Sequence, residues 1–259
     1  MKTISIVTIV FIGIISFFFW KQEFQTSISP SKISESEMAM PIPVLEPARP
    51  EFVPAVIEKQ QVIPMKVIIQ DVPFISQAPT GNWKDSVFQN ACEEASLLMA
   101  DKWVRGGVFG TSKQVEMEIR KITDVEKKYF PKDSYDLSVQ DILLLAQKYF
   151  PKMNISLTKD VSSDDMKNAL FEGNIVIIPA NGQKLRNPNF TSPGPLYHTL
   201  LIRGYDSATD EFITNDPGTR RGDGYHYPAD IVFSAMQDYE TGYHGKRFPD
   251  EKVMLVVSR

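Results

Sequence analysis

The pattern of hydrophobic and polar positions divides the chain into an apolar stretch, a proline-rich stretch and a long globular part. The first stretch, Ile4 to Trp20, carries no charge and is bracketed by Lys2 and Lys21. As a helix it would reach about 25 Å, which is just enough to span a hydrocarbon core and exceeds the usual apolar region of a signal peptide. We therefore expect residues 1–24 to form an uncleaved membrane anchor.

A cleaved signal peptide is the alternative. The best site with two small residues, Ser27 to Ser29, is followed at once by Pro30, which disfavours cleavage. Basic residues on the two sides of the apolar stretch balance, so charge does not fix its orientation. By analogy with signal anchors that carry a short N-terminal tail, we expect the C-terminal part to face outward, away from the cytoplasm.

Residues 25–64 lack a hydrophobic period and are rich in proline, which predicts an extended, semi-rigid linker. The prolines are Pro30, Pro41, Pro43, Pro47, Pro50, Pro54 and Pro64. Residues 65–259 have the alternation of apolar and polar positions that is typical of one globular domain with a sizeable core.

Within that domain the pattern predicts helices first and mostly antiparallel strands afterwards, which indicates the α+β class. After a first strand at 66–70, the expected helices are 92–104, 112–122, 138–150 and 162–171. The remaining strands are expected at 174–180, 197–206, 211–216 and 252–258, with a short helix near 228–239.

Composition removes several classes of function. The 28 basic and 32 acidic residues give a net charge of −4, so no basic surface for nucleic acid is indicated. The single cysteine excludes an intramolecular disulfide and the common cysteine-based zinc sites, and the three histidines have no metal-ligand spacing. Because a phosphate-binding glycine motif is also absent, we expect no metal, no cofactor and no nucleotide.

The lone cysteine, Cys92, lies in the stretch FQNACEEASLLMA at the expected start of a helix. A helix N-terminus stabilises anions and lowers the pKa of a thiol. Glu93 and Glu94 would oppose a thiolate, and we expect them to be solvated and to point away, with Glu94, Asp101 and Arg105 forming the exposed stripe of the helix. A buried cysteine that only fills the core is the commoner alternative.

A histidine and an aspartate that could assist this thiol follow by counting along an expected hairpin. His198 lies nine residues before Ser207, the centre of the loop, and Asp216 lies nine after it. A symmetric hairpin places them directly opposite on one face, whereas a slip of one residue replaces Asp216 with Asn215. The alternative is a satisfied core histidine beside an aspartate. His226 and His244 have no such partner, and we expect them at the surface.

Four segments resemble the stand-alone, C39-like branch of the double-glycine leader peptidases, which are family 39 of the cysteine peptidases. They are VPFISQAPTGNW, NACEEASLLM, YHTLLIRGYD and FITNDPGTRRGDGYHY, and the likeness covers roughly residues 70–240. The resemblance implies a papain-like fold with the nucleophile at the start of a central helix and the histidine and aspartate on an antiparallel sheet. It also implies an upstream glutamine that stabilises the oxyanion.

Gln77 in FISQ matches that glutamine best, and Gln89 is the rival because APTGNWKDSVFQ resembles an insertion. The chain departs from the better-known members by reading Cys-Glu-Glu where many have Cys-Gly and by lacking a nucleotide-binding motif. These departures argue against a bacteriocin leader as the substrate.

Together these observations predict a membrane-anchored thiol peptidase that acts on a peptide or protein. Cys92 is the expected nucleophile, His198 the base, Asp216 its orienting group, and Gln77 with the Cys92 N–H the oxyanion donors. The alternatives are an amidase or acyltransferase on cell-wall peptides with the same triad, and a peptide-binding domain without catalysis.

The apolar stretch generates the first prediction, that the N-terminus stays attached to the protein. Protein from membrane fractions should begin at or near Met1, and protease added to intact cells should remove the globular domain. N-terminal sequencing and a protease-protection assay check both points. Recovery of a soluble chain that begins near Pro30 would show a cleaved signal peptide instead.

Overall fold

A computed structural model describes residues 66–130 and 136–259. The expected anchor and linker lie outside these residues. Among the described residues, no helix has the length and apolarity needed to cross a membrane.

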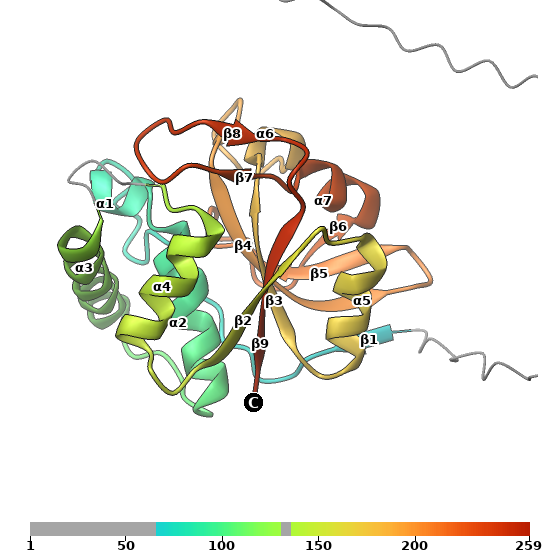
Figure 1. Ribbon diagram of the computed structural model, residues 1–259. Helices are drawn as coiled ribbons and strands as arrows, with labels where there is room; N and C mark the ends of the chain where they lie inside the picture. The colour runs from blue at the N-terminus through green and yellow to red at the C-terminus, as the bar shows by residue number, and fades with distance from the viewer. Residues whose placement is uncertain (1–65, 131–135) are drawn as a thin grey trace, which may run out of the picture. The chain divides into compact units, whose positions relative to one another are not determined.

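A seven-stranded antiparallel sheet forms the centre of this part of the chain (Figure 1). The strands run in the order β2-β9-β3-β4-β5-β6, and β1 pairs with β4 beyond the bulged part of that strand. Their bounds are β1 Lys66–Ile68, β2 Asn154–Lys159, β3 Ile175–Ala180, β4 His198–Asp206, β5 Glu211–Asn215, β6 Tyr225–Pro228 and β9 Val253–Ser258. A separate pair is made by β7 Asp238–Tyr239 and β8 Arg247–Phe248.

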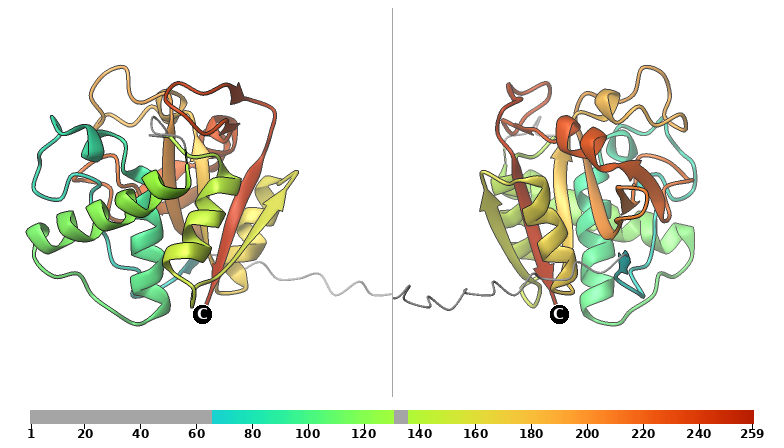
Figure 2. Two further views of the ribbon diagram at one scale, coloured as in Figure 1. Left: turned by 60° about the vertical axis from the view of Figure 1, so that its left-hand side comes forward. Right: turned by 90° about the vertical axis from the view of Figure 1, so that its right-hand side faces the viewer.

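Helices cover both faces of the sheet, as Figures 1 and 2 show. On one side lie α2 Cys92–Val104, α3 Ser112–Tyr129 and α4 Val139–Tyr149, preceded by the short α1 Ser86–Gln89. On the other lie α5 Ser163–Phe171 and α7 Ala229–Ala235, with the short α6 Gly182–Leu185 beside α7. The alternation of β4 serves both layers, because Leu201 joins the core under α2 while Leu200 and Ile202 join the core under α5.

The expected elements are present, but several bounds differ, and the short elements α1, α6, β6, β7 and β8 were not expected. The helix from Ser112 continues to Tyr129 rather than ending at Ile122. The segment 154–159, which was not expected to be a strand, pairs along its whole length with β9 at the edge of the sheet. The expected helix near 228–239 is shorter, because α7 ends at Ala235 and Asp238–Tyr239 forms strand β7.

Local capping explains where several helices begin. The Ser138 side chain accepts a hydrogen bond from the Asp141 N–H, as the sequence predicts for the start of α4. Ser162 and Thr111 each complete a capping box at the start of α5 and α3. These ends fix the lengths of the helices that surround the site.

The expected exposed stripe of α2 is wrong. Glu94 and Asp101 are buried, and only Arg105 reaches solvent. α2 lies between α3 and the sheet, so its polar positions are covered as well as its apolar ones. Asp101 is neutralised by its ion pair with Arg105, and Glu94 accepts a hydrogen bond from Thr123 at 2.9 Å.

Candidate active site

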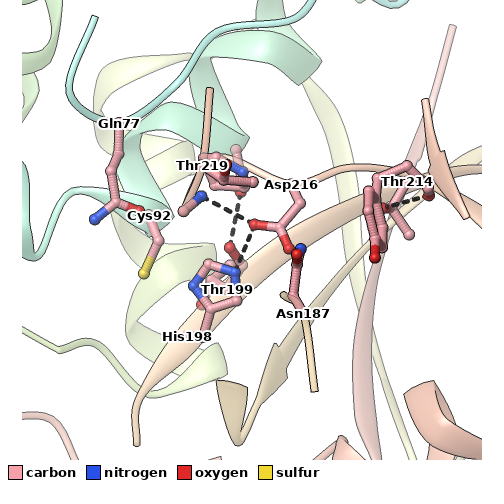
Figure 3. A network of polar contacts seen from close by, with 12 residues as sticks. Gln77, Cys92, Asn187, His198, Thr199, Thr214, Asp216 and Thr219 are labelled. Carbon is pink, nitrogen blue, oxygen red and sulfur yellow. Dashed lines mark hydrogen bonds and ion pairs between the residues drawn. The ribbon is translucent and has the colours of Figure 1, made fainter. Parts of the chain in front are cut away.

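Cys92 is the first residue of α2, as the sequence predicts, and its side chain is 3 % exposed. It lies at the floor of a cleft of about 670 Å³ that His198 and Gln77 also line. Figure 3 shows the sulfur directed toward the imidazole of His198. The hydrogen bond of the thiol, however, goes to Oε2 of Glu93 at 3.0 Å.

The surroundings raise the pKa of the Cys92 thiol well above its ordinary value, contrary to the lowering expected from the helix N-terminus. Burial is the largest cause, followed by the charge of Glu93 and the hydrogen bond that Glu93 accepts. The backbone N–H of Thr199, next to His198, lowers the pKa in part. The free protein therefore holds a neutral thiol.

Glu93 and Glu94 are buried rather than solvated, which corrects the expectation from sequence. Glu93 accepts hydrogen bonds from the Tyr239 hydroxyl at 3.0 Å and from the Leu137 N–H at 3.3 Å, besides the one from Cys92. Burial, with repulsion from Glu94 and then Asp136, raises the pKa of Glu93 to about 8. Its neighbourhood thus makes Glu93 a carboxyl that is largely neutral at pH 7.

Two more acids complete this cluster beneath the nucleophile. Glu126 hydrogen-bonds to Glu94, and burial together with the charge of Glu94 raises the pKa of Glu126 to about 11. Burial and the charge of Glu94 likewise raise the pKa of Asp136 to about 6. Burial thus keeps protons on Glu93 and Glu126 at pH 7, whereas Asp136, with a pKa of about 6, is largely ionised there.

His198 and Asp216 are in contact, as the counting predicts. His198 Nε2 lies 2.8 Å from Asp216 Oδ1, and both side chains are buried. Nε2 rather than Nδ1 of the ring faces the carboxylate. Nδ1 is therefore the nitrogen left for the cleft.

The register behind this contact differs from the symmetric hairpin. Asp206 pairs with Glu211, so the hairpin is centred between Ala208 and Thr209 rather than on Ser207, and Leu201 pairs with Asn215. A β-bulge between Ile202 and Gly204 adds one residue to β4. By extension Asp216 faces Leu200, which makes His198 its diagonal neighbour on the same face.

The bulge decides which face Asp216 occupies. Without it, the pairing of Gly204 with Ile213 would continue to place Asp216 opposite Leu201. Leu201 points to the opposite face from His198, because successive side chains alternate. One extra residue at Arg203 thus puts the carboxylate on the side of the imidazole.

Asp216 is fully buried and holds three hydrogen-bond donors. Besides His198, the Tyr227 hydroxyl donates to Oδ2 at 2.5 Å and the Gly218 N–H donates to Oδ1 at 2.9 Å. Burial alone would raise the pKa of Asp216, but the charge of His198 and these hydrogen bonds outweigh it, and the pKa is lowered. Asp216 therefore stays an anion.

Tyr227, Asn187 and Gly218 were not found from the sequence. Asn187 donates to the Tyr227 hydroxyl at 2.6 Å, so a chain of side chains leads from Asn187 to His198 (Figure 3). A Cβ on Gly218 would lie 2.8 Å from His198 Cε1, so only glycine fits beside the ring. The sequence could have suggested Tyr227 alone, because Tyr227 lies in the next strand along the chain after Asp216.

Asn215 does not reach the imidazole. Its Nδ2 donates to the Val72 carbonyl at 3.2 Å, and its Oδ1 accepts from Arg203 Nε at 2.9 Å and from the Gly224 N–H at 3.2 Å. Asn215 thus ties the N-terminal segment and the bulge to β5, which is a structural role.

The two candidate glutamines both line the cleft. Gln77 is buried beside Cys92, and its Nε2 donates to the carbonyls of Phe88 at 3.1 Å and Gln89 at 2.9 Å, whereas its Oε1 has no hydrogen-bond partner. The Gln89 side chain is exposed and donates to the Trp83 carbonyl. Gln77 is the better placed, although its amide hydrogens are directed to the backbone.

The other two histidines are exposed, as expected. His226 does have a partner, since its Nδ1 lies 3.0 Å from Glu211 Oε2. His244 packs against the rings of Tyr197 and Tyr243. Within the residues described, no group of histidine, cysteine and acidic side chains has the arrangement of a metal site.

The model of the Peptidase_C39 like family matches residues 69–247, which is more than half of the chain. The chain belongs to this family. The described part accordingly has the α+β, papain-like fold that the resemblance implies. The boundaries of the anchor, linker and domain stay predictions.

Other comparisons add little to the C39-like assignment. A crystal structure of a protein from Bacillus anthracis, itself only provisionally assigned as a C39-like peptidase, is similar with 19 % identity and a TM-score of 0.47. The match covers 75 % of this chain and 98 % of the other, and at that score it carries no argument of its own. No protein with a curated description matches the chain.

The contrast between Asp216 and Asn215 generates a prediction. Asp216→Asn should leave the fold nearly intact and lower kcat by up to roughly 10²–10⁴-fold, because the anion that orients and stabilises the protonated imidazole is lost. Asn215→Ala should instead lower the free energy of unfolding by roughly 1–3 kcal/mol through its unpaired buried partners. Steady-state kinetics and chemical denaturation separate the two. Equal losses of kcat in both folded variants would contradict the assignment.

The contact between Glu93 and the Cys92 thiol generates another prediction. Glu93 gains its charge as the pH rises through about 8, so the thiol of the wild type must ionise beside a carboxylate. Glu93→Gln removes that charge and should shift the pH midpoint of Cys92 alkylation by iodoacetamide downward. The exposed Glu172→Gln serves as control and should leave the midpoint unchanged. An unaltered midpoint in Glu93→Gln would show that burial alone sets the pKa.

Proposed function

We propose that this C39-like protein hydrolyses peptide bonds through Cys92, His198 and Asp216. The observation that carries the proposal is the cleft in which the sulfur of Cys92 is directed toward an imidazole whose other side is bonded to a buried, ionised carboxylate. A nucleophile, a base and a group that orients the base are the parts that thiol catalysis requires.

The tautomer of His198 follows from its partner. Nε2–H donates to Asp216, which leaves Nδ1 without a proton and able to accept one from the thiol. The thiol turns from Glu93 to Nδ1, the proton passes to the imidazole, and the Asp216 anion stabilises the resulting cation. The raised pKa of Cys92 supports a proton transfer that accompanies attack on the substrate.

The bond changes are those of acyl transfer. The sulfur forms a bond to the carbonyl carbon, the C–N bond breaks, and the imidazolium returns its proton to the leaving amine. Water then gives a proton to His198 and attacks the thioester, releasing the acid and the thiol. The Cys92 N–H, which has no partner within its own helix, stabilises the oxyanion, and the Gln77 side chain joins it when one of its amide hydrogens turns from the Phe88 or Gln89 carbonyl.

We further propose that the protein acts at a membrane surface, on the outer side. The support is the uncharged stretch from Ile4 to Trp20, which lies outside the described residues. An amidase or acyltransferase on cell-wall peptides would use the same triad. A peptide-binding domain without catalysis is favoured by one observation, the neutral thiol held by Glu93.

A reactivity test separates catalysis from binding. The full-length chain should be labelled stoichiometrically by a peptidyl electrophile, faster at pH 7 than a free model thiol of ordinary pKa. Cys92→Ala should abolish labelling and His198→Gln should slow it by roughly 10²-fold or more, because the base is missing. Intact-mass spectrometry follows both. Labelling of the wild type no faster than that of the model thiol would leave the binding domain as the function.

A further inference from the structure

The wall of the cleft that follows Asp216 carries two adjacent arginines, Arg220 and Arg221. The loop that holds them is fixed at both ends. The Asp216 N–H donates to the Gly222 carbonyl at 2.9 Å, and the Gln77 N–H donates to the Pro217 carbonyl at 2.9 Å. The arginines therefore belong to the same rigid unit as the acid and the glutamine of the site.

Arg220 is exposed, and its guanidinium lies against the turn at Gly81. A Cβ built on Gly81 would lie 2.0 Å from Nη2 of Arg220, so the guanidinium lies directly on the backbone there. Gly81 has φ +81°, a conformation that favours glycine in its own right. Arg220 thus lines the cleft from a fixed turn and also borders a neighbouring pocket beside Phe74 and Pro79.

Neither guanidinium is neutralised by a carboxylate within the described residues. Arg220 has no hydrogen bond or ion pair there, and the side chain of Arg221 makes a single long hydrogen bond to Asn189 Oδ1 at 3.5 Å. Arg105, Arg120 and Arg203 each face an aspartate, whereas Arg186 and Arg247 resemble the cleft arginines in having no ion pair among the described residues. Two unpaired cations thus line a cleft of a chain whose net charge is −4.

The acidic residue of the cleft does not cancel them. Asp136 is 5 % exposed, and its carboxylate accepts the backbone N–H of His244, which belongs to a different loop. Its raised pKa, about 6, reflects burial first and the charge of Glu94 second. The charge that the cleft presents to solvent is therefore positive, since arginine stays protonated at any physiological pH.

We propose that Arg220 and Arg221, with the turn at Gly81, form a subsite for a carboxylate of the substrate. The inference rests on the proposed function and adds its substrate class, a peptide with an anionic group near the scissile bond. A guanidinium fork matches a carboxylate in geometry as well as charge. That carboxylate is either an aspartate or glutamate side chain or the free C-terminus of the peptide.

The test uses the full-length chain and a peptide library of known sequences, with cleavage sites identified by mass spectrometry. The wild type should cleave peptides with aspartate or glutamate at one fixed position about three- to tenfold more often than the same peptides with glutamine or asparagine. Cleavage at a fixed distance from the C-terminus, without a preference for internal acids, would identify the terminal carboxylate as the source. Raising the salt concentration from about 50 mM to about 0.5 M should weaken either preference.

Arg220→Gln/Arg221→Gln should lose the preference and keep cleavage of neutral peptides. Lys121→Gln/Lys152→Gln, which removes two exposed charges outside the cleft, should keep it. Cleavage that depends on Cys92 but shows no preference for carboxylates, or a preference that survives in the arginine variant, would overturn the subsite while leaving the peptidase intact.

A second readout does not require turnover. Cys92 is alkylated with iodoacetate, which carries a carboxylate, and with neutral iodoacetamide, and the ratio of the two rate constants is compared. The ratio should fall several-fold in the arginine variant and stay constant in the lysine variant. Should no Cys92-dependent cleavage occur, the proposed peptidase fails, and an unchanged ratio then overturns the anionic subsite as well.

Discussion

A carboxylate that stays ionised in full burial must be surrounded by donors, and the arrangement around Asp216 meets that constraint. Three separate parts of the chain supply the donors: the first residue of β4, the tyrosine of β6 and the loop after β5. Removing any one leaves a buried anion short of a partner, which is costly. The meeting of β4, β5 and β6 is therefore tied to the same group that contacts His198, so the packing of this half of the sheet and the geometry of the proposed site depend on the same hydrogen bonds.

The other half of the site follows the opposite principle. Around Cys92 the burial of several acids is satisfied by keeping protons on them, and the thiol is neutral among them. A protein interior tolerates a carboxyl with a hydrogen-bond partner far better than an unpaired carboxylate. The cleft thus separates a protonated side, under α2, from an ionised side, at the end of β5, with His198 between them. The proton of the Cys92 thiol can therefore leave the protonated side only by passing to the imidazole of His198.

The sequence was sufficient for the longer helices and most of the longer strands and for bringing His198 together with Asp216, because those depend on local signals. The bounds of α2 follow from the polar turn before Cys92 and from the glycine pair after Arg105, and the alternation in β4 follows from its apolar period. Contacts between residues that are far apart in the chain could not be predicted from the sequence. The burial of Glu93 depends on Tyr239 and Leu137, which are far away in the chain, and the contact of Tyr227 with Asp216 depends on the pairing of β6 with β5. The symmetric hairpin predicted the aspartate that contacts His198 from a wrong register. The observed pairing is shifted by an even number of residues, which leaves each side chain on the expected face of the sheet.

Because side chains alternate between the two faces of the sheet, only an odd shift in the pairing of β4 with β5 moves a residue to the other face. Length changes in the turn between Asp206 and Glu211 add or remove loop without altering the pairs further along β4 and β5, so evolution can vary that turn freely. A single deletion at the bulge is different in kind. It would shift every residue from His198 to Ile202 by one place against β5 and carry the imidazole and the carboxylate to opposite sides of the sheet. Relatives that share the contact between His198 and Asp216 should therefore differ in the turn and agree on the bulge.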